Sequence, residues 1–188
     1  MKITAITFFF VVFANIAFGQ HNHQDHNTPT TETQAKDLGK VDNSVRKQLN
    51  KVLNHYFDVK NALVATNSKN AALKASNFLK ILAEVETAKM TTDQQNYFSK
   101  LAEQLKTNAN QIAQTTDVEA QRTEFENFSA AMYLLAKSFR NNNISVYKQF
   151  CPMAFNDKGA YWLSEKPDVL NPYFGNKMLR CGSVTETF

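Results

Sequence analysis

Apolar residues recur along this chain in four stripes whose members are separated by three positions, four positions or their sum. The stripes comprise Val45, Leu49, Val52, Tyr56, Val59 and Leu63; Ala71, Ala75, Phe78, Leu82 and Val85; Phe98, Leu101, Leu105 and Ile112; and Phe125, Phe128, Met132, Leu135 and Phe139. This spacing puts each stripe on one face of an α-helix. The pattern therefore predicts four helices of similar length that bury their stripes against one another.

Polar residues mark the expected helix starts. Asp42 or Ser44 can cap the first helix, and Asp117 can cap the fourth. In residues 91–95, a threonine followed three residues later by a glutamine resembles a capping box before the third helix. The links between the helices are short and polar, which makes neighbouring helices antiparallel. We expect an all-α fold with an antiparallel up-down four-helix bundle over residues 41–141.

The composition changes after residue 141. Residues 144–188 hold three of the four prolines and three of the five glycines, and no segment alternates with period two for long. The same residues include a dense aromatic set: Tyr147, Phe150, Phe155, Tyr161, Trp162, Tyr173 and Phe174. So many aromatic side chains would not be left in water. We expect residues 142–188 to form a loop-rich aromatic C-terminal cap that completes one helical domain, residues 41–188.

The first 19 residues have the pattern of a secretory signal peptide. Lys2 precedes a short apolar run, and small residues stand at Ala17 and Gly19, which indicates cleavage after Gly19. The run is too short for a spanning helix and is followed by polar residues, so no membrane span is expected. The predicted location is outside the cytoplasm: the protein is secreted, and the periplasm is the expected compartment.

Residues 20–40 contain almost nothing apolar and cannot bury enough surface to offset the entropy of ordering. We interpret them as a flexible leader. It carries His21, His23 and His26, and imidazole suits Cu(II), Zn(II) and Ni(II). These histidines form a weaker candidate metal site. The alternative interpretation is a polar tail that happens to contain histidine.

The charge distribution and the absence of known catalytic motifs argue against two classes of function, nucleic-acid binding and catalysis. Loss of Lys2 with the signal peptide lowers the formal net charge from +4 to +3, and lysines and glutamates are interspersed along the helices. That distribution is typical of solvated helix faces and does not indicate nucleic-acid binding. The chain has no Gly-x-Ser-x-Gly motif, no glycine-rich phosphate loop, and no histidine in the cap to activate a cysteine. We therefore do not expect an enzyme.

The only two cysteines each stand close to a methionine. Cys151-Pro152-Met153 places two sulfur donors on one local turn, and Met178-Leu179-Arg180-Cys181 places two on another. Thiolate and thioether ligands select soft ions such as Cu(I) and Ag(I). Zinc is less suited, because no Cys-x-x-Cys motif or paired histidine spacing exists. The predicted metal ligands are Cys151, Met153, Met178 and Cys181, and Cu(I) is the only cofactor considered.

A disulfide is the alternative for the same cysteines. A secreted protein with an even cysteine count usually oxidises them. Cys151 and Cys181 stand 30 positions apart, and a bridge over such a loop contributes roughly 3–4 kcal/mol in the loop-entropy model. Met153 and Met178 would then be core filler. A bridge that opens on reduction would expose the Cu(I) ligands, so the two interpretations overlap.

Five short segments carry a resemblance to a known family: Gln121–Phe125, Cys151–Ala154, Gly159–Ser164, Asn171–Gly175 and Met178–Gly182. The chain resembles, over about residues 45–186, an uncharacterised family of secreted helical domains classed as a domain of unknown function. Members occur alone or appended to periplasmic adaptor subunits of heavy-metal efflux pumps. The resemblance implies a setting in periplasmic heavy-metal handling. We expect a soft-metal accessory protein. The alternative is a disulfide-stapled interaction module that docks on an efflux adaptor or another envelope partner without metal.

Overall fold

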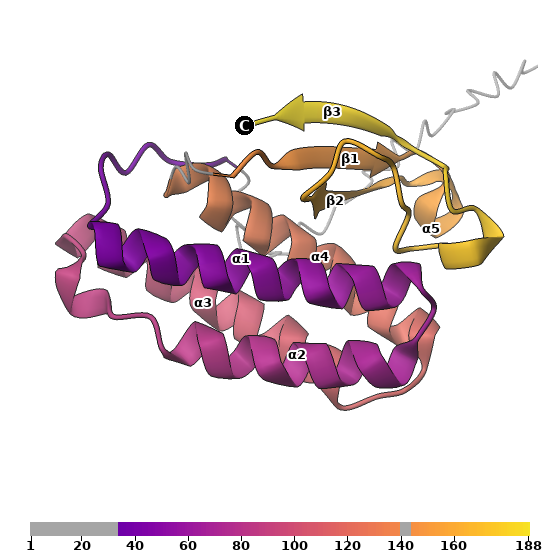
Figure 1. Cartoon of the computed structure of the whole chain (residues 1–188), viewed down its shortest axis with the longest axis horizontal. Helices are drawn as coiled ribbons and strands as arrows, with labels where there is room; N and C mark the ends of the chain where they lie inside the picture. Colours follow the sequence, from indigo (N-terminus) through magenta and orange to yellow (C-terminus); the bar gives the residue numbers. More distant parts are fainter. Residues whose placement is uncertain (1–33, 140–143) are drawn as a thin grey trace, which may run out of the picture. The chain divides into compact units, whose positions relative to one another are not determined.

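Four long helices form most of the structure. The computed structural model describes residues 34–139 and 144–188. The helices are α1 (Asn43–Val64), α2 (Ser68–Ala83), α3 (Thr92–Ala113) and α4 (Val118–Ser138), with a short 3₁₀ turn, η1 (Thr87–Lys89), before α3. Each helix contacts the next one in the chain, and α1 also contacts α4 (Figure 1). The predicted helices are therefore present as a bundle, while their antiparallel up-down arrangement stays a prediction.

The helix starts follow the predicted capping residues. The Asp42 carboxylate accepts a hydrogen bond from the Ser44 backbone N–H at 2.8 Å and begins α1. Thr91 and Gln94 exchange side-chain and backbone hydrogen bonds in a complete capping box before α3. Asp117 accepts from the backbone N–H of Glu119 at 3.0 Å at the start of α4. Each cap satisfies a backbone donor that the helix itself leaves unpaired.

The four apolar stripes form the core of the bundle. Every stripe residue is buried except Val85, which is partly buried against the core. Phe128 lies at the centre, with its ring 4.7 Å from that of Phe78 and 5.4 Å from that of Tyr56, measured between centroids. Full burial of one such side chain stabilises the fold by about 1.5–3 kcal/mol. The prediction that each apolar stripe faces the core of the bundle is confirmed.

The C-terminal region contains a sheet, which corrects the all-α prediction. Strands β1 (Tyr147–Cys151), β2 (Ala160–Ser164) and β3 (Ser183–Thr187) form a three-stranded antiparallel sheet in the order β2-β1-β3. The connections contain a short turn labelled α5 (Ala154–Asp157) and a 3₁₀ turn, η2 (Gly175–Lys177). Residues 162–164 of β2 are buried consecutively, and β3 is mostly exposed and polar. Neither strand therefore shows the alternation that would have predicted it.

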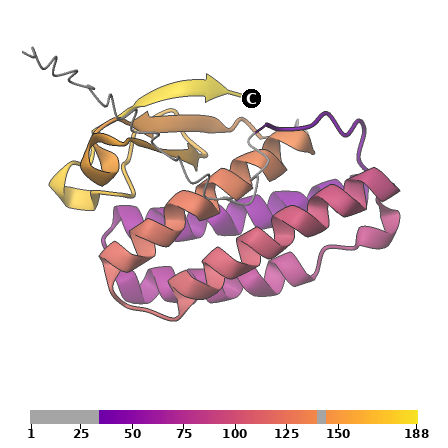
Figure 2. The same ribbon diagram turned by 180° about the vertical axis from the view of Figure 1, so that it is seen from behind.

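The sheet packs on the bundle through α4. Strand β2 contacts α4, and η2 contacts α1. Figure 2 shows from behind that the sheet lies on the α1 and α4 side of the bundle, away from α2. We call residues 144–188 the cap. Among the described residues, no helix has the length and apolarity that a membrane crossing requires.

The segment before α1 is packed, which moves the predicted domain boundary. The Lys36 backbone N–H donates to the Ser138 hydroxyl at 2.9 Å. The Gln94 side-chain amide donates to the backbone oxygens of Leu38 and Lys40 at 3.0 and 3.2 Å. This segment has no apolar stripe, but hydrogen bonds with Gln94 on α3 and Ser138 on α4 hold it against the bundle. Residues 34–40 therefore belong to the folded domain. The predicted signal peptide and the leader residues 20–33 lie outside the described residues.

Candidate functional site

The register of the sheet brings the two cysteines together. Cys151 is the last residue of β1, and Phe150 beside it pairs with Ser183, the first residue of β3. Because the two strands are antiparallel, Gly182 comes level with Cys151, and Cys181 stands one residue further along the chain that leads into β3. The two sulfur atoms lie 2.6 Å apart, closer than non-bonded sulfur atoms approach, so the pair is placed for a disulfide bond as well as for joint binding of a metal ion. The structure thus joins two sequence-predicted site residues from opposite ends of the cap.

The two thiols differ in their surroundings. Cys151 is 0% exposed, whereas Cys181 is only partly buried. Burial and the neighbouring Cys151 thiol raise the pKa of Cys181 to about 11, against the opposing effect of a hydrogen bond from the Met153 backbone. The Cys181 thiol is therefore protonated near neutral pH. A metal ion that binds thiolate must displace protons, so metal uptake at this pair would depend on pH.

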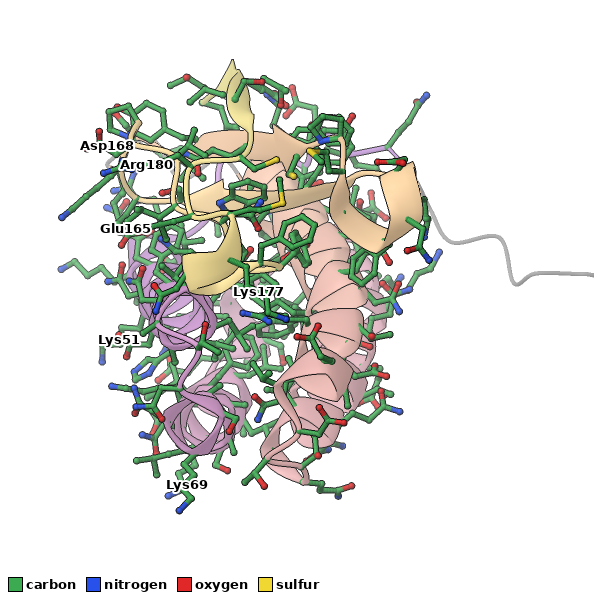
Figure 3. All side chains as sticks on the ribbon, turned by 90° about the vertical axis from the view of Figure 1, so that its right-hand side faces the viewer. Lys51, Lys69, Glu165, Asp168, Lys177 and Arg180 are labelled. Carbon is green, nitrogen blue, oxygen red and sulfur yellow. The ribbon has the colours of Figure 1, made fainter. Side chains whose placement is uncertain are left out.

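Both methionines adjoin Cys181 through the backbone. The Met153 backbone N–H faces the Cys181 sulfur, and the Met178 carbonyl oxygen accepts a hydrogen bond from the Cys181 N–H at 3.1 Å. The Met153 side chain is 47% exposed and Met178 is partly buried. In the view of Figure 3, sulfur atoms of the cap fall within one region of the molecule. Ligation by the two thioethers stays a prediction.

Gly182 allows the chain to pass close to β1. Its φ of +136° is unfavourable for other residues. A Cβ atom there would lie 2.8 Å from the Phe150 carbonyl oxygen and 3.0 Å from the Trp162 ring. The backbone contact leaves no room for a side chain. Gly182 therefore permits the approach that seats Cys181 beside Cys151.

A strained turn follows Cys151. Phe155, Asn156 and Asp157 have φ values of 54°, 56° and 65°, in the left-handed region. That conformation costs about 1–2 kcal/mol per non-glycine residue. The turn connects β1 to β2. The backbone beside the cysteine pair is held in a conformation that the surrounding packing must maintain.

Asn171 organises the second half of the site. Its side-chain amide N–H donates to the Cys181 carbonyl oxygen at 2.8 Å, and its side-chain oxygen accepts from the backbone N–H groups of Tyr173 and Phe174 at 2.8 and 3.2 Å. Its own N–H donates to the Leu179 carbonyl oxygen at 2.9 Å, and the residue is fully buried. The sequence analysis identifies Asn171 only as part of the segment Asn171–Gly175 that carries the family resemblance. No local pattern reveals that the asparagine holds the Cys181 segment.

Arg122 joins the cap to the bundle. Its Nε donates to the Pro172 carbonyl oxygen at 2.9 Å, and its Nη1 pairs with Glu119 at 2.8 Å. Its Nη2 reaches the Thr66 hydroxyl at 3.2 Å in the link between α1 and α2. The buried guanidinium therefore bridges α4, that link and the segment before η2. This side chain therefore links the cap to the bundle through hydrogen bonds.

A buried ion pair anchors the other end of the cap. Lys60 on α1 is 2% exposed, and its Nζ lies 2.8 Å from the Glu165 carboxylate just after β2. Asn61 donates to the second carboxylate oxygen at 3.0 Å. Burial lowers the pKa of Lys60. Burial also opposes ionisation of Glu165, but hydrogen bonds from Lys60 and Asn61 outweigh that effect and keep the pKa of Glu165 below its usual value.

Sulfur is the donor type that converges at the candidate site. Within residues 34–139 and 144–188, no group of three or more His, Cys, Asp or Glu side chains is arranged to hold a metal ion. The site therefore consists of Cys151 and Cys181, with Met153 two residues after Cys151 and Met178 three residues before Cys181 along the chain. The weaker candidates His21, His23 and His26 lie outside the described residues.

The fold and site define a helical bundle domain that carries a sheet cap with paired thiols. The model of the family described as "Protein of unknown function (DUF3347)" matches residues 52–143. The match shows that the chain contains a domain of unknown function, and it covers the bundle from the middle of α1 onward. The cap motifs lie beyond the matched residues. No curated protein and no solved structure matches the chain.

Proposed function

We propose that this protein binds a soft monovalent metal ion, Cu(I) or Ag(I), through Cys151 and Cys181 and serves as an accessory protein in heavy-metal homeostasis. Met153 and Met178 are the further donors. The observation that carries the proposal is the convergence of the two cysteine sulfur atoms, with Cys151 fully buried. The predicted signal peptide supports a setting outside the cytoplasm, in the periplasm.

The donor set and its surroundings favour a soft ion. Thiolate and thioether sulfur are the ligands that Cu(I) and Ag(I) prefer over harder cations. The buried Trp162 packs beside Gly182, so an aromatic shell borders the pair and limits solvent access. A bound ion requires the two sulfur atoms to move apart from 2.6 Å. Cys181 lies in the loop before β3, outside the strands, so a shift of this residue would leave the strand pairing intact.

The competing function is an interaction module stapled by a Cys151–Cys181 disulfide. A specific observation favours it as a second candidate. Of the four large apolar side chains that are exposed among the described residues, three lie in the cap: Met153, Tyr161 and Val184. Exposed apolar residues close together are typical of protein interaction surfaces. In this account the cap docks on an efflux adaptor or another envelope protein, and no metal is involved.

A Cu(I) competition titration separates the two functions. We expect fully reduced protein, kept anaerobic, to take one Cu(I) per chain from a chromogenic chelator. Trp162 is the only tryptophan and packs beside Gly182, so its fluorescence should report the uptake. Absence of uptake by the reduced wild type would contradict the metal function and leave the interaction module.

Methionine variants test the thioethers. Met153→Leu and Met178→Leu keep volume and apolarity but remove sulfur, so each should weaken Cu(I) binding about tenfold or more if its thioether is a ligand. Met132→Leu is the matched control, because Met132 is buried in the bundle. Equal Cu(I) affinities for all three variants would restrict the site to the cysteines. Helical circular dichroism should be unchanged in each variant.

A further inference from the structure

The two sulfur atoms of the candidate site differ in their access to other molecules. Cys151 ends β1, pairs with Ala160 of β2 and is 0% exposed. Cys181 is partly exposed and precedes β3, where no strand pairing restrains it. Any reagent that approaches the pair from outside therefore meets Cys181 first. The pair has one accessible sulfur and one protected sulfur.

Exposed apolar residues lie on the strands and the turn next to the cysteine pair. Phe150 pairs with Tyr161 on β2 and with Ser183 on β3, so one row of the sheet crosses all three strands beside the cysteine pair. Tyr161 is 47% exposed, and Val184 follows Ser183. Met153, also 47% exposed, presents its backbone N–H to the Cys181 sulfur. Strand alternation puts Phe150 and Tyr161 on the face of the sheet opposite to Cys151, so the exposed apolar residue that directly adjoins the Cys181 sulfur is Met153.

We propose that the Cys151–Cys181 pair is a substrate for a thiol–disulfide oxidoreductase, that the exchange takes place at Cys181, and that only the dithiol form binds the metal. The last part rests on the proposed function. The first two parts rest on the proximity of the thiols and their unequal exposure. The partner is a protein with a dithiol and disulfide pair of its own.

The exchange is balanced in atoms and electrons. Starting from the oxidised protein, a thiolate of the partner attacks the Cys181 sulfur, and the bond between Cys181 and Cys151 breaks. Cys151 leaves as a thiolate and takes up a proton, and a mixed disulfide joins the partner to Cys181. The second thiolate of the partner attacks its own sulfur in that bond, and Cys181 leaves and is protonated. Two electrons and two protons pass from the partner dithiol to this protein.

Trapping of the mixed disulfide tests the exchange site. The probe is a thioredoxin in which the second cysteine of the Cys-x-x-Cys motif is replaced by serine, so that the mixed disulfide cannot resolve. We expect the oxidised wild-type protein to form this adduct, and peptide mass spectrometry should find it on Cys181. An adduct on Cys151, equal adducts on both cysteines, or no adduct would overturn the proposal.

Labelling of the reduced protein provides a second readout that needs no variant. A bulky maleimide should modify Cys181 at least about tenfold faster than Cys151 in the native state, because reactivity requires access. In denaturant the two rates should converge. Cys151→Ser and Cys181→Ser can then be compared with glutathione disulfide, where only the first should form a mixed disulfide. Native labelling of Cys151 as fast as Cys181 would contradict the assigned asymmetry.

Cu(I) titration of both redox forms keeps the two proposals distinguishable. The dithiol form should bind one Cu(I) and the disulfide form none in competition with the chelator. If neither form binds, the metal function fails, and with it the redox control of metal binding, while trapping still decides where exchange occurs. If both forms bind equally, the metal function stands and the redox control is overturned.

Discussion

The bundle and the cap are held together in different ways. In the bundle, periodic apolar residues pack through many contacts, as Phe128 does against Phe78. In the cap, single polar side chains hold whole segments: Asn171 holds the loop of Cys181, Arg122 holds the segment before η2, and Lys60 holds the end of β2. The difference implies a division between apolar packing, which the cap shares with the bundle core through Trp162, Leu163 and Tyr173, and polar anchors, which fix the loops of the cap.

This division explains why the cap can carry strain. Three consecutive left-handed residues and a closely packed glycine are unfavourable locally. A robust bundle beneath them offsets that strain. The strained residues lie near the two cysteines, since Phe155 follows Cys151 by four positions and Gly182 follows Cys181 directly. Variants in each region can test this separation.

The largest expected effect is in the bundle core. Phe128→Ala should lower the free energy of unfolding by about 3–5 kcal/mol, because it removes a fully buried ring. Chemical denaturation followed by circular dichroism measures the change. The matched control is Lys69→Ala, whose exposed side chain points away from the bundle in Figure 3 and which should change stability by less than about 0.5 kcal/mol. Lys137 is unsuitable as a control, since it pairs with Glu186. Similar losses of stability in both variants would contradict the assignment of Phe128 to the core and Lys69 to the surface.

The second effect is confined to the cap. Gly182→Ala should destabilise the cap by about 2–3 kcal/mol, because the new Cβ meets the Phe150 carbonyl and φ is positive. Gly39→Ala is the control: its φ is +69°, but nothing lies within 4 Å of the added Cβ. The control should cost about 1 kcal/mol, from φ alone. Thermal transitions of Trp162 fluorescence measure both, and equal effects would show that the close approach at Gly182 is unimportant.

As the pH falls, the packing of the cap should be lost at a higher pH than the helical structure of the bundle. Hydrogen bonds from Lys60 and Asn61 hold the pKa of Glu165 below 4.5, despite burial. A lowered carboxyl pKa contributes stability that is present above the unfolded value and is lost as pH falls through the folded value. Between about pH 5 and 3, Trp162 fluorescence should therefore change while helical signal persists. Glu165→Gln should weaken this acid response. Coincident loss of both signals in the wild type would oppose the separation of cap and bundle.

The smallest effect concerns the segment before α1. A protein starting at Gln34 should be as stable as one starting at Gln20, whereas one starting at Val41 should lose about 1–2 kcal/mol with the hydrogen bonds to Ser138 and Gln94. Differential scanning calorimetry of the three lengths measures this. If the shortest protein melts with the others, the packing of residues 34–40 contributes nothing.

The sequence predicts the bundle well because its information is local and periodic. The stripes and the caps at Asp42, Thr91 and Asp117 each act within a few residues. The cap depends on long-range pairing: β3 is an exposed polar strand identified by its partner β1, and Asn171 acts on Cys181 ten residues away. The pairing of the two cysteines was predictable as an alternative, but their register and unequal burial were not.

X-ray absorption spectroscopy of the Cu(I)-loaded, reduced protein tests the central claim most directly. The account predicts that copper is retained after desalting at one ion per chain and that its nearest neighbours are sulfur atoms alone, since the described site offers sulfur donors. The same spectrum of Cys151→Ser should lose sulfur neighbours. Copper that is retained with nitrogen or oxygen neighbours, or that is lost on desalting, would contradict the account.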